Sequence, residues 1–570
     1  MKEKTGRGIK ILEAAVLLGI LGDALLRAHP WGLNVLLWAL ALACALLVSL
    51  TRWRRRALAG GGHWLLLAAL LCASAYAWRD SLTLNFLAGA GVLTSLALLV
   101  WRARGGPLRL AGLTDYARGI LTAAGNALCI GFPRLLGDVD WKEVTGVGWT
   151  RYWKPVARGL LIALPLLLLF CGLFVAADAG FADLLAGFFT TNHDNLLGHL
   201  LLALSLTWVS GGFLRAALFG GEVKPRARET FTAQPQTEGN AAADPYAVLT
   251  PPPLKAEPFS LGIIEVGVTL GLLNLLFLAF VLTQLRYLFG GAALVQGEGA
   301  WTYAQYYRRG FFELVTVAVL VLPVLLSAHK LLRKENAAHE RVFRALAGAQ
   351  VILLFVIMAS AVRRMLLYQS EYGLTELRLY TTAFIAWLCL VFVWFILTVL
   401  RGRREQFAFG SLVAGFLIVA TLHVINPDAL IVRTNLAHAR AGRGFDARYA
   451  VTLSADAVPA LLEALPELKN PDDRRYIAVT ILDRWSEEEG EDWRTWNWSR
   501  AQSRWAVLDR WSELNALDTE WRINREVGAP VEVIPPGDTV SGEVAAAVKA
   551  PAGETKRRTQ KRKGAGLRAR

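Results

Sequence analysis

The sequence predicts an all-α fold: a polytopic transmembrane bundle of about eleven helices, followed by a small helical region outside the membrane. The chain of 570 residues is 54% hydrophobic and only 19% charged, whereas soluble domains carry about 25% charged residues. Apolar runs of about 20 residues, the length that crosses a bilayer as a helix, recur as far as residue 425. Beyond that point the chain is rich in charged residues and tryptophan.

Eleven apolar stretches are predicted to cross the membrane. The first follows a basic start, contains Glu13 and Asp23, and lacks a small-residue cleavage site, which favours a retained signal anchor. Pro323 is expected to kink the eighth stretch, because proline removes a hydrogen bond within a helix. The stretches are residues 11–26, 33–50, 64–78, 84–101, 156–177, 195–219, 261–289, 310–332, 342–367, 375–400 and 407–425.

The segments between these stretches complete the predicted organisation. From Leu113 onward, apolar residues recur at helical spacing beside one polar face, which indicates a helix lying on the membrane surface. The predicted segments are a four-span part (1–101), a cytoplasmic interfacial part (102–155), two spans (156–219), a disordered Pro-rich cytoplasmic loop (220–258), a five-span core (259–425), a helical Trp-rich soluble region (426–550) and a basic disordered tail (551–570).

Basic residues predict the direction of the spans. If the N-terminus is cytoplasmic, the inner segments up to Lys154 contain sixteen Lys and Arg residues, and the outer loops contain only Arg27 and Arg79. This asymmetry is the positive-inside distribution of membrane proteins. With an odd number of spans, the C-terminal region is then predicted to lie outside.

Tryptophan is the distinctive residue of the C-terminal region. We favour a small helical domain with an aromatic core and rim, because burial is the common role of indole rings. The alternative is a surface that binds an envelope protein, a glycan or lipid headgroups. The seven tryptophans are Trp485, Trp493, Trp496, Trp498, Trp505, Trp511 and Trp521.

A group of charges lies at the outer ends of the eighth, ninth and tenth spans. A short turn at 369–374 holds the last two antiparallel, Gly373 permits a positive φ, and Thr375 suits a helix N-cap. Two interpretations remain open: charges placed at helix ends by the helix dipole, or an Arg/Glu cluster that closes an outward-facing polar cavity. The candidate polar cluster comprises Arg308, Glu313, Arg363, Arg364, Tyr372, Thr375, Glu376 and Arg378.

The other polar residues predict no chemical site. Glu265 and Asn274 lie within the seventh span, where contact with water or a neighbouring helix is the simpler interpretation. His193, Asp194 and His199 flank the sixth span without the spacing of a helical zinc site. The five cysteines form no CxxC pair, and nucleotide-binding or nucleophile-elbow motifs are absent from the sequence. No catalytic residue, cofactor or metal is therefore predicted, and no nucleic-acid partner is expected.

Three stretches together resemble a known family: TYAQYYRRGFFEL at 302–314, EYGLTELRLY at 371–380 and NPDALIVRTN at 426–435. Their order and spacing are similar to those of bacterial polytopic membrane proteins of unknown function, in the domain-of-unknown-function families forty-one fifty-three and forty-one seventy-three. The resemblance covers roughly residues 161–465 and implies a multi-pass protein of the bacterial cytoplasmic membrane, with no established activity. It adds Asn426, Pro427, Asp428 and Asn435 to the candidate positions, although the aromatic residue expected before Asn435 is missing.

Three functions follow as hypotheses. The first is a transport-like or envelope-associated protein with a polar outward-facing cavity. The second is a membrane transferase acting on a lipid-linked substrate, which requires a base beside a lateral groove. The third is a non-enzymatic scaffold or sensor accessory. The lipid bilayer is the expected partner in each case, and the sequence predicts neither the substrate nor the oligomeric state.

Overall fold

A computed structural model of the protein describes residues 3–53, 61–141, 196–219, 261–289, 311–333, 336–485 and 492–526. Among these residues the regular elements are helices, and the β-type pairing is one isolated bridge between Leu261 and Leu332. The chain divides into two compact units, Met1–Asn515 and Ala516–Arg570. The first unit contains the elements described below, and the second contains the end of one helix.

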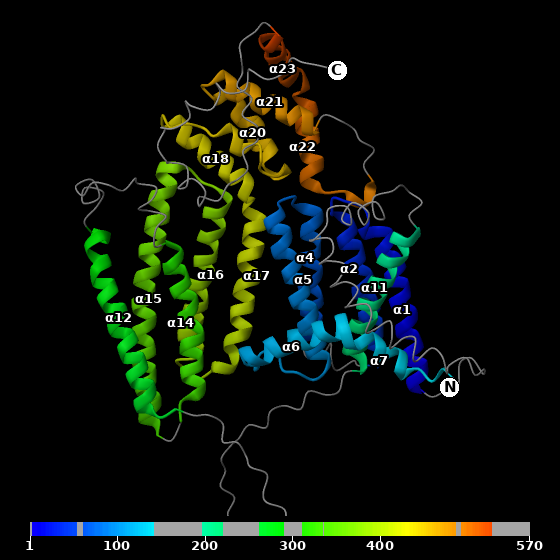
Figure 1. Cartoon of the computed structure of the whole chain (residues 1–570), viewed down its shortest axis with the longest axis vertical. Helices are drawn as coiled ribbons and strands as arrows, with labels where there is room; N and C mark the ends of the chain where they lie inside the picture. Colours follow the sequence, from blue (N-terminus) through cyan, green and yellow to red (C-terminus); the bar gives the residue numbers. More distant parts are fainter. Residues whose placement is uncertain are drawn as a thin grey trace, which may run out of the picture. The chain divides into compact units, whose positions relative to one another are not determined.

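The N-terminal helices pack around a core of small and aliphatic side chains. They are α1 (Glu3–Leu26), α2 (Leu33–Trp53), α4 (His63–Trp78), α5 (Leu82–Ala103) and α11 (Leu196–Phe219) (Figure 1).

Helices α1 and α11 approach closely because glycines line their contact, and a Cβ at Gly19 would collide with Thr207. Their direction is antiparallel, since Asp23 binds His199 near one end and Lys4 and Arg215 share Asp138 at the other.

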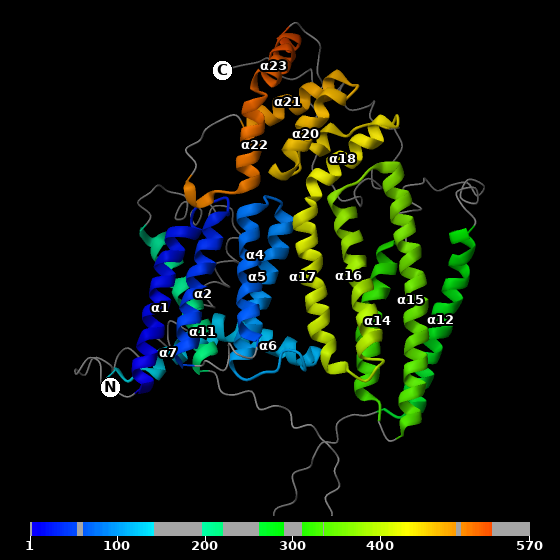
Figure 2. The ribbon, with the colours of Figure 1, turned by 180° about the vertical axis from the view of Figure 1, so that it is seen from behind.

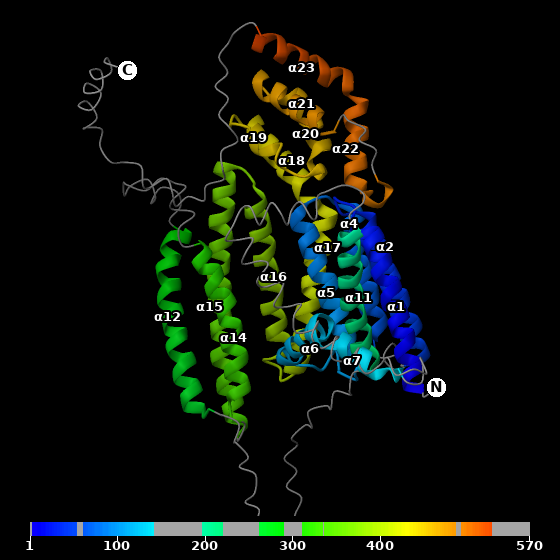
Figure 3. The same ribbon diagram turned by 45° about the vertical axis from the view of Figure 1, so that its right-hand side comes forward.

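The amphipathic segment predicted from Leu113 forms α6 (Leu113–Gly125), the π-helical turn η2 (Asn126–Ile130) and α7 (Gly131–Asp138). Figures 1 and 3 show these elements running across the ends of α5 and α11 instead of alongside them. Leu121 and Leu128 are exposed. This arrangement suits a helix at the membrane surface, although the segment is also long and apolar enough to span.

A second group of helices follows later in the chain. It consists of α12 (Ile263–Phe289), α14 (Phe311–Leu331), α15 (Ala337–Tyr372), α16 (Glu376–Thr398) and α17 (Phe407–Ile425), with the short η4 (Arg404–Gln406) before α17.

Helix α15 lies at the centre of this group and packs against α12, α14 and α16 (Figure 2). Phe343, Phe392 and Phe395 are fully buried in its core. On the other side, α17 packs against both α16 and α5.

Ten of the eleven predicted spans are helices, and the stretch 156–177 lies outside the described residues. In the described part of the chain, nine helices are long and apolar enough to cross a membrane: eight predicted spans and Leu113–Asp138. Helix α4 has only 16 residues, and α1 carries Lys10, Glu13 and Asp23 in its apolar part. The prediction was too short for α15, which runs from Ala337 to Tyr372.

Residues 426–515, here called the C-terminal domain, form a group of shorter helices. They are α18 (Pro427–Arg440), α19 (Ala447–Ala450), η5 (Ala455–Ala457), α20 (Val458–Ala464), η6 (Leu465–Glu467), α21 (Pro471–Trp485), η7 (Trp493–Thr495), α22 (Trp498–Asp509) and the start of α23 (Trp511–Glu526).

The predicted helical character of this region is confirmed. Of the tryptophans whose side chains are described in this domain, only Trp485 is buried, and the other five are exposed: Trp493, Trp496, Trp498, Trp505 and Trp511. The core is built instead from aliphatic side chains such as Leu461, Leu465, Ile477 and Ile481.

Candidate functional site

The predicted polar cluster is spread over several environments. Arg308 lies outside the described residues. Glu313 is exposed in the first turn of α14, where a carboxylate suits the helix dipole. Arg363 is exposed and Arg364 half-buried, two to three turns before the end of α15.

Arg378 secures the end of the preceding helix. Its Nη1 donates to the carbonyl oxygens of Tyr372, at 3.0 Å, and Gly373, at 2.5 Å. Its guanidinium carbon also stands 4.1 Å from the centre of the Tyr368 ring. The side chain therefore satisfies carbonyls that α15 leaves without partners.

The turn after α15 is joined to the C-terminal domain. Gly373 has φ 73° and ψ −178°, a conformation that is open almost only to glycine. Asn435 of α18 accepts from the Leu374 N–H at 2.7 Å and donates to the Leu374 carbonyl at 2.9 Å. The structure thus brings together two of the three recognised stretches, EYGLTELRLY and NPDALIVRTN.

The start of α16 is capped differently from the prediction. Thr375 occupies the N-cap position as expected, but its side chain makes no capping hydrogen bond. The Glu376 N–H donates to the hydroxyl of Tyr449 at 2.8 Å. Burial raises the pKa of Tyr449 to about 12, so this phenol stays protonated. The cap comes from a residue 73 positions away, which sequence reasoning missed.

Asn426 joins the last long apolar helix to the domain. It has φ 56° and stands at once as the C-cap of α17 and the N-cap of α18. Its side-chain oxygen accepts from the Ala429 N–H at 3.2 Å, and its Nδ2 donates to the Asp456 carbonyl at 3.1 Å. Pro427 fills the first position of α18, where the missing N–H has no helical acceptor to lose.

Asp428 is almost fully buried, with 1% of its surface exposed. Its Oδ2 accepts from both the amide and the hydroxyl of Ser454. Its Oδ1 has no hydrogen-bond partner among the described residues. Burial raises the pKa of Asp428 to about 6, against the opposing effect of the Ser454 hydrogen bond, and the nearby Glu376 carboxylate raises it further.

Asp456 is the centre of a buried network that the sequence did not predict. Arg79 Nη1 donates to it at 3.2 Å, and the backbone N–H groups of Asp80 and Ser81 donate at 2.8 and 3.0 Å. The hydroxyl of Ser499 also donates, whereas Ser454 Oγ, whose one hydrogen goes to Asp428, lies 3.2 Å from Asp456 Oδ2. This carboxylate therefore receives four donors from the α4–α5 loop and α22.

A second ion pair completes the network. Arg500 Nη1 lies 3.6 Å from Asp80 Oδ1, and Asp80 also accepts from the Ala455 N–H at 3.3 Å. Burial raises the pKa of Asp80, and the Arg500 charge opposes this rise. Arg79 donates through Nε to the His423 carbonyl at 2.9 Å, which ties in the end of α17. We call Arg79, Asp80, Ser81, His423, Ser454, Asp456, Ser499 and Arg500 the Asp456 junction.

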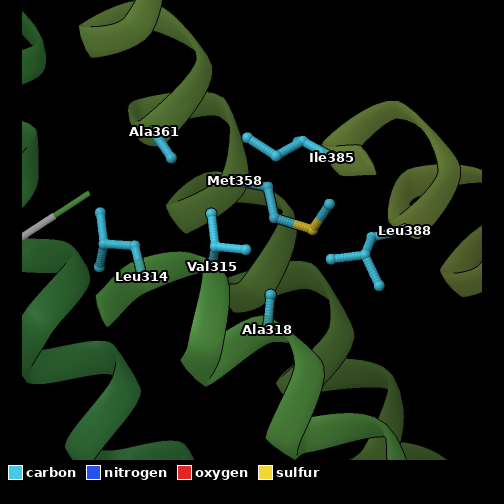
Figure 4. Close-up of a pocket in the computed structure, with 7 residues that line it drawn as sticks. All are labelled: Leu314, Val315, Ala318, Met358, Ala361, Ile385 and Leu388. Carbon is cyan, nitrogen blue, oxygen red and sulfur yellow. The ribbon is translucent and has the colours of Figure 1, made fainter. Parts of the chain in front are cut away.

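An apolar pocket lies among α14, α15 and α16 (Figure 4). Its lining consists of Leu314, Val315, Ala318, Met358, Ala361, Ile385 and Leu388. None of the predicted polar-cluster residues lines it. The polar outward-facing cavity stays a prediction, because the pocket described at this place is apolar.

The described helices and the Asp456 junction define an integral, multi-pass membrane protein with a helical domain joined to its bundle. The chain belongs to the family described as "Domain of unknown function (DUF4153)", which matches residues 65–464. This match confirms the resemblance found in the sequence, and it includes both halves of the Arg79–Asp456 pair. No curated protein and no solved structure matches the chain.

Proposed function

We propose that this protein is a non-enzymatic scaffold or sensor accessory of the cell envelope, in which the C-terminal domain and the membrane helices form one mechanical unit. The Asp456 junction is the observation that carries this proposal. Its carboxylate connects the α4–α5 loop, α22 and, through Arg79, the end of α17. Removing one partner of such a buried pair is costly, so the network holds one arrangement of domain and helices.

The chemistry of the buried carboxylates also favours a structural role. A general base needs a free acceptor within reach of a substrate proton. Asp456 is surrounded by donors of the protein itself, and Asp80 is held by Arg500 and a backbone N–H. Asp428 Oδ1 has no partner among the described residues, but the side chain is 1% exposed and so lies out of reach of a substrate proton. The pocket among α14, α15 and α16 offers only apolar side chains.

The proposal includes an orientation. We place the N-terminus in the cytoplasm and the C-terminal domain outside a bacterial cytoplasmic membrane, on the basis of the positive-inside count. Contacts of the domain with the loops after α1 and α4, and with the turn after α15, support a common side for these elements. Reporter fusions after residues 400 and 515 should report opposite sides, and fusions that report the same side would contradict this orientation.

The scaffold role is tested by comparing Asp456→Ala with a matched control, Glu467→Ala. Glu467 pairs with Arg440 at 2.5 Å on the exposed surface of the same domain. We expect a single envelope protein to co-purify in fixed proportion with wild type and Glu467→Ala, and to be lost with Asp456→Ala.

Complementation of a deletion strain gives the decisive reading. Glu467→Ala should rescue the strain and Asp456→Ala should not. If Asp456→Ala rescues fully although thermal denaturation shows that the variant is destabilised, the junction is not the working part and the proposal is wrong.

A second candidate function is the handling of a lipid-linked substrate, as a transporter or a transferase. The pocket among α14, α15 and α16 favours it, because Leu314 and Val315 line the pocket directly after the exposed Glu313. An acyl chain lying against this apolar surface would place its headgroup near this carboxylate.

Met358→Trp should fill the pocket and abolish cross-linking of a diazirine lipid to the pocket residues Leu314 and Val315. Leu320→Trp on the exposed face of α14 is the matched control. Unchanged cross-linking in Met358→Trp would rule out this second function.

A further inference from the structure

The exposed tryptophans of the C-terminal domain lie next to the ends of three apolar helices. Arg494 donates to the Ala24 carbonyl in the last turn of α1. The Trp496 carbonyl accepts from the Leu33 N–H, the first residue of α2, at 2.9 Å. Asn497 Nδ2 donates to the Tyr76 carbonyl near the end of α4, at 2.8 Å. Trp493, Trp496 and Trp498 therefore alternate with the residues that dock the domain on the bundle.

Three of these indole rings pack against one another. Trp496 and Trp498 have ring centres 6.5 Å apart, and Trp498 and Trp505 have ring centres 5.9 Å apart in an edge-to-face arrangement. Trp493 and Trp505 are 64% and 60% exposed. Trp31 and Trp78 at the helix ends are also exposed. We call Trp31, Trp78, Trp493, Trp496, Trp498 and Trp505 the tryptophan belt.

The surface beside the belt is the apolar side of the helices. Ile20 on α1 and Leu71 on α4 are more than half exposed, and Leu40 on α2 is 39% exposed, as expected for side chains that face lipid. Figure 3 shows α22 beginning beside the ends of α2 and α4. The belt is thus continuous with the lipid-facing surface and begins where the apolar helices end.

Charge is a minor part of this surface. Arg494 is paired with Asp492, and Arg500 faces Asp80 in the buried junction. Indole prefers the boundary between hydrocarbon and water because its ring is apolar and its N–H is polar. This preference needs no anionic lipid.

We propose that the tryptophan belt binds the headgroup layer of the bilayer, so that the C-terminal domain rests on the membrane beside its own helices. The interfacial layer on each side of the hydrocarbon is ~6 Å thick. The Trp505 ring centre lies 5.9 Å from that of Trp498, about the thickness of this layer. Trp493, Trp496 and Trp498 are therefore immersed, and Trp505 lies at the outer edge of the layer.

Spin labels test this proposal in the full chain. The five native cysteines, none of which lies in the C-terminal domain, are first replaced. Single cysteines then replace Trp493, Trp496, Trp498 or Trp505, and each labelled protein is placed in phosphatidylcholine nanodiscs. Tyr476→Cys is the matched control, because Tyr476 is an exposed aromatic residue on α21, which packs within the domain.

We expect labels at 493, 496 and 498 to collide with oxygen several-fold more often, relative to a water-soluble nickel complex, than the label at 476. The label at 505 should give an intermediate ratio. Equal ratios at all five positions would overturn the proposal, because the belt would then face water. Protection from both reagents would also overturn it, because a protein would then cover the belt. Thermal denaturation confirms that each variant is folded.

Discussion

The turn between α15 and α16 and the Asp456 junction are two polar regions at the same end of the described helices, but they use charge differently. At the turn, Arg378 is half-buried and binds carbonyls five and six residues away. At the junction, Arg79 and Asp456 are buried and separated by 377 residues. The charge at the turn binds free carbonyl groups at a nearby helix end, whereas the charges at the junction hold together parts of the chain that are distant in sequence.

Asp456→Ala is expected to have the largest effect on this contrast. It removes the acceptor of four donors and leaves the buried Arg79 without its carboxylate, which costs about 3–5 kcal/mol of unfolding free energy. Arg378→Ala should cost less than about 1 kcal/mol, because water can reach the carbonyls that it leaves. Thermal denaturation in detergent measures both. Equal losses would remove the distinction between the two regions.

The next effect is a pH dependence at Asp428. The folded pKa of about 6 lies above the ordinary value of 3.8, so the folded state binds this proton more tightly than the unfolded state. Its contribution to stability is complete below pH ~4 and is lost as the pH rises through ~6, by up to about 3 kcal/mol. Asp428→Asn keeps an acceptor for Ser454 and should remove this loss. Parallel melting curves of both proteins from pH 4.5 to 8 would contradict the expectation.

Gly373→Ala tests whether the turn depends on backbone shape more than on charge. The φ of 73° strains any other residue, and a Cβ would lie 2.7 Å from Asn435 Oδ1. We expect a loss of about 1–3 kcal/mol, larger than that of Arg378→Ala. Gly442→Ala is the control, because it also has a positive φ but its Cβ would meet nothing within 4 Å. Equal losses in the two variants would show that the contact with Asn435 adds nothing.

The smallest expected effect separates the predicted cap from the observed one. Tyr449→Phe deprives the Glu376 N–H of its acceptor and should cost about 1 kcal/mol. Thr375→Ala removes a side chain that makes no capping bond and should change stability by less than about 0.5 kcal/mol. The opposite order of losses would restore Thr375 as the functional cap.

Local features of the fold were predictable from the sequence. Long apolar runs predicted ten of the described helices because length and composition alone decide whether a segment can span. Gly373 was placed correctly in a positive-φ turn, since the turn between two antiparallel helices is short. The role of Thr375 was wrong in detail, because residue type predicts an N-cap position but not which distant hydroxyl competes for the free N–H.

The Asp456 junction could not be predicted in the same way. Arg79 and Asp80 stand after an apolar run, where charged side chains usually reach water, and hydropathy cannot distinguish this from burial. Their partners come from residues more than 370 positions later. Only the pairing of helices brings these segments together. The one available signal was the NPD stretch, whose Asn426 and Asp428 touch the edge of the junction through Asp456 and Ser454.

Asn426 makes the connection between α17 and α18 rigid and bent. A single left-handed residue separates the final turn of α17 from the first turn of α18, so no slack segment lies between them. A rotation of α17 about its long axis would therefore change the direction of α18. The hydrogen bonds of Asn435 to Leu374 would transmit this movement to the turn after α15. Inserting even two flexible residues between α17 and α18 would uncouple the movements of the two helices.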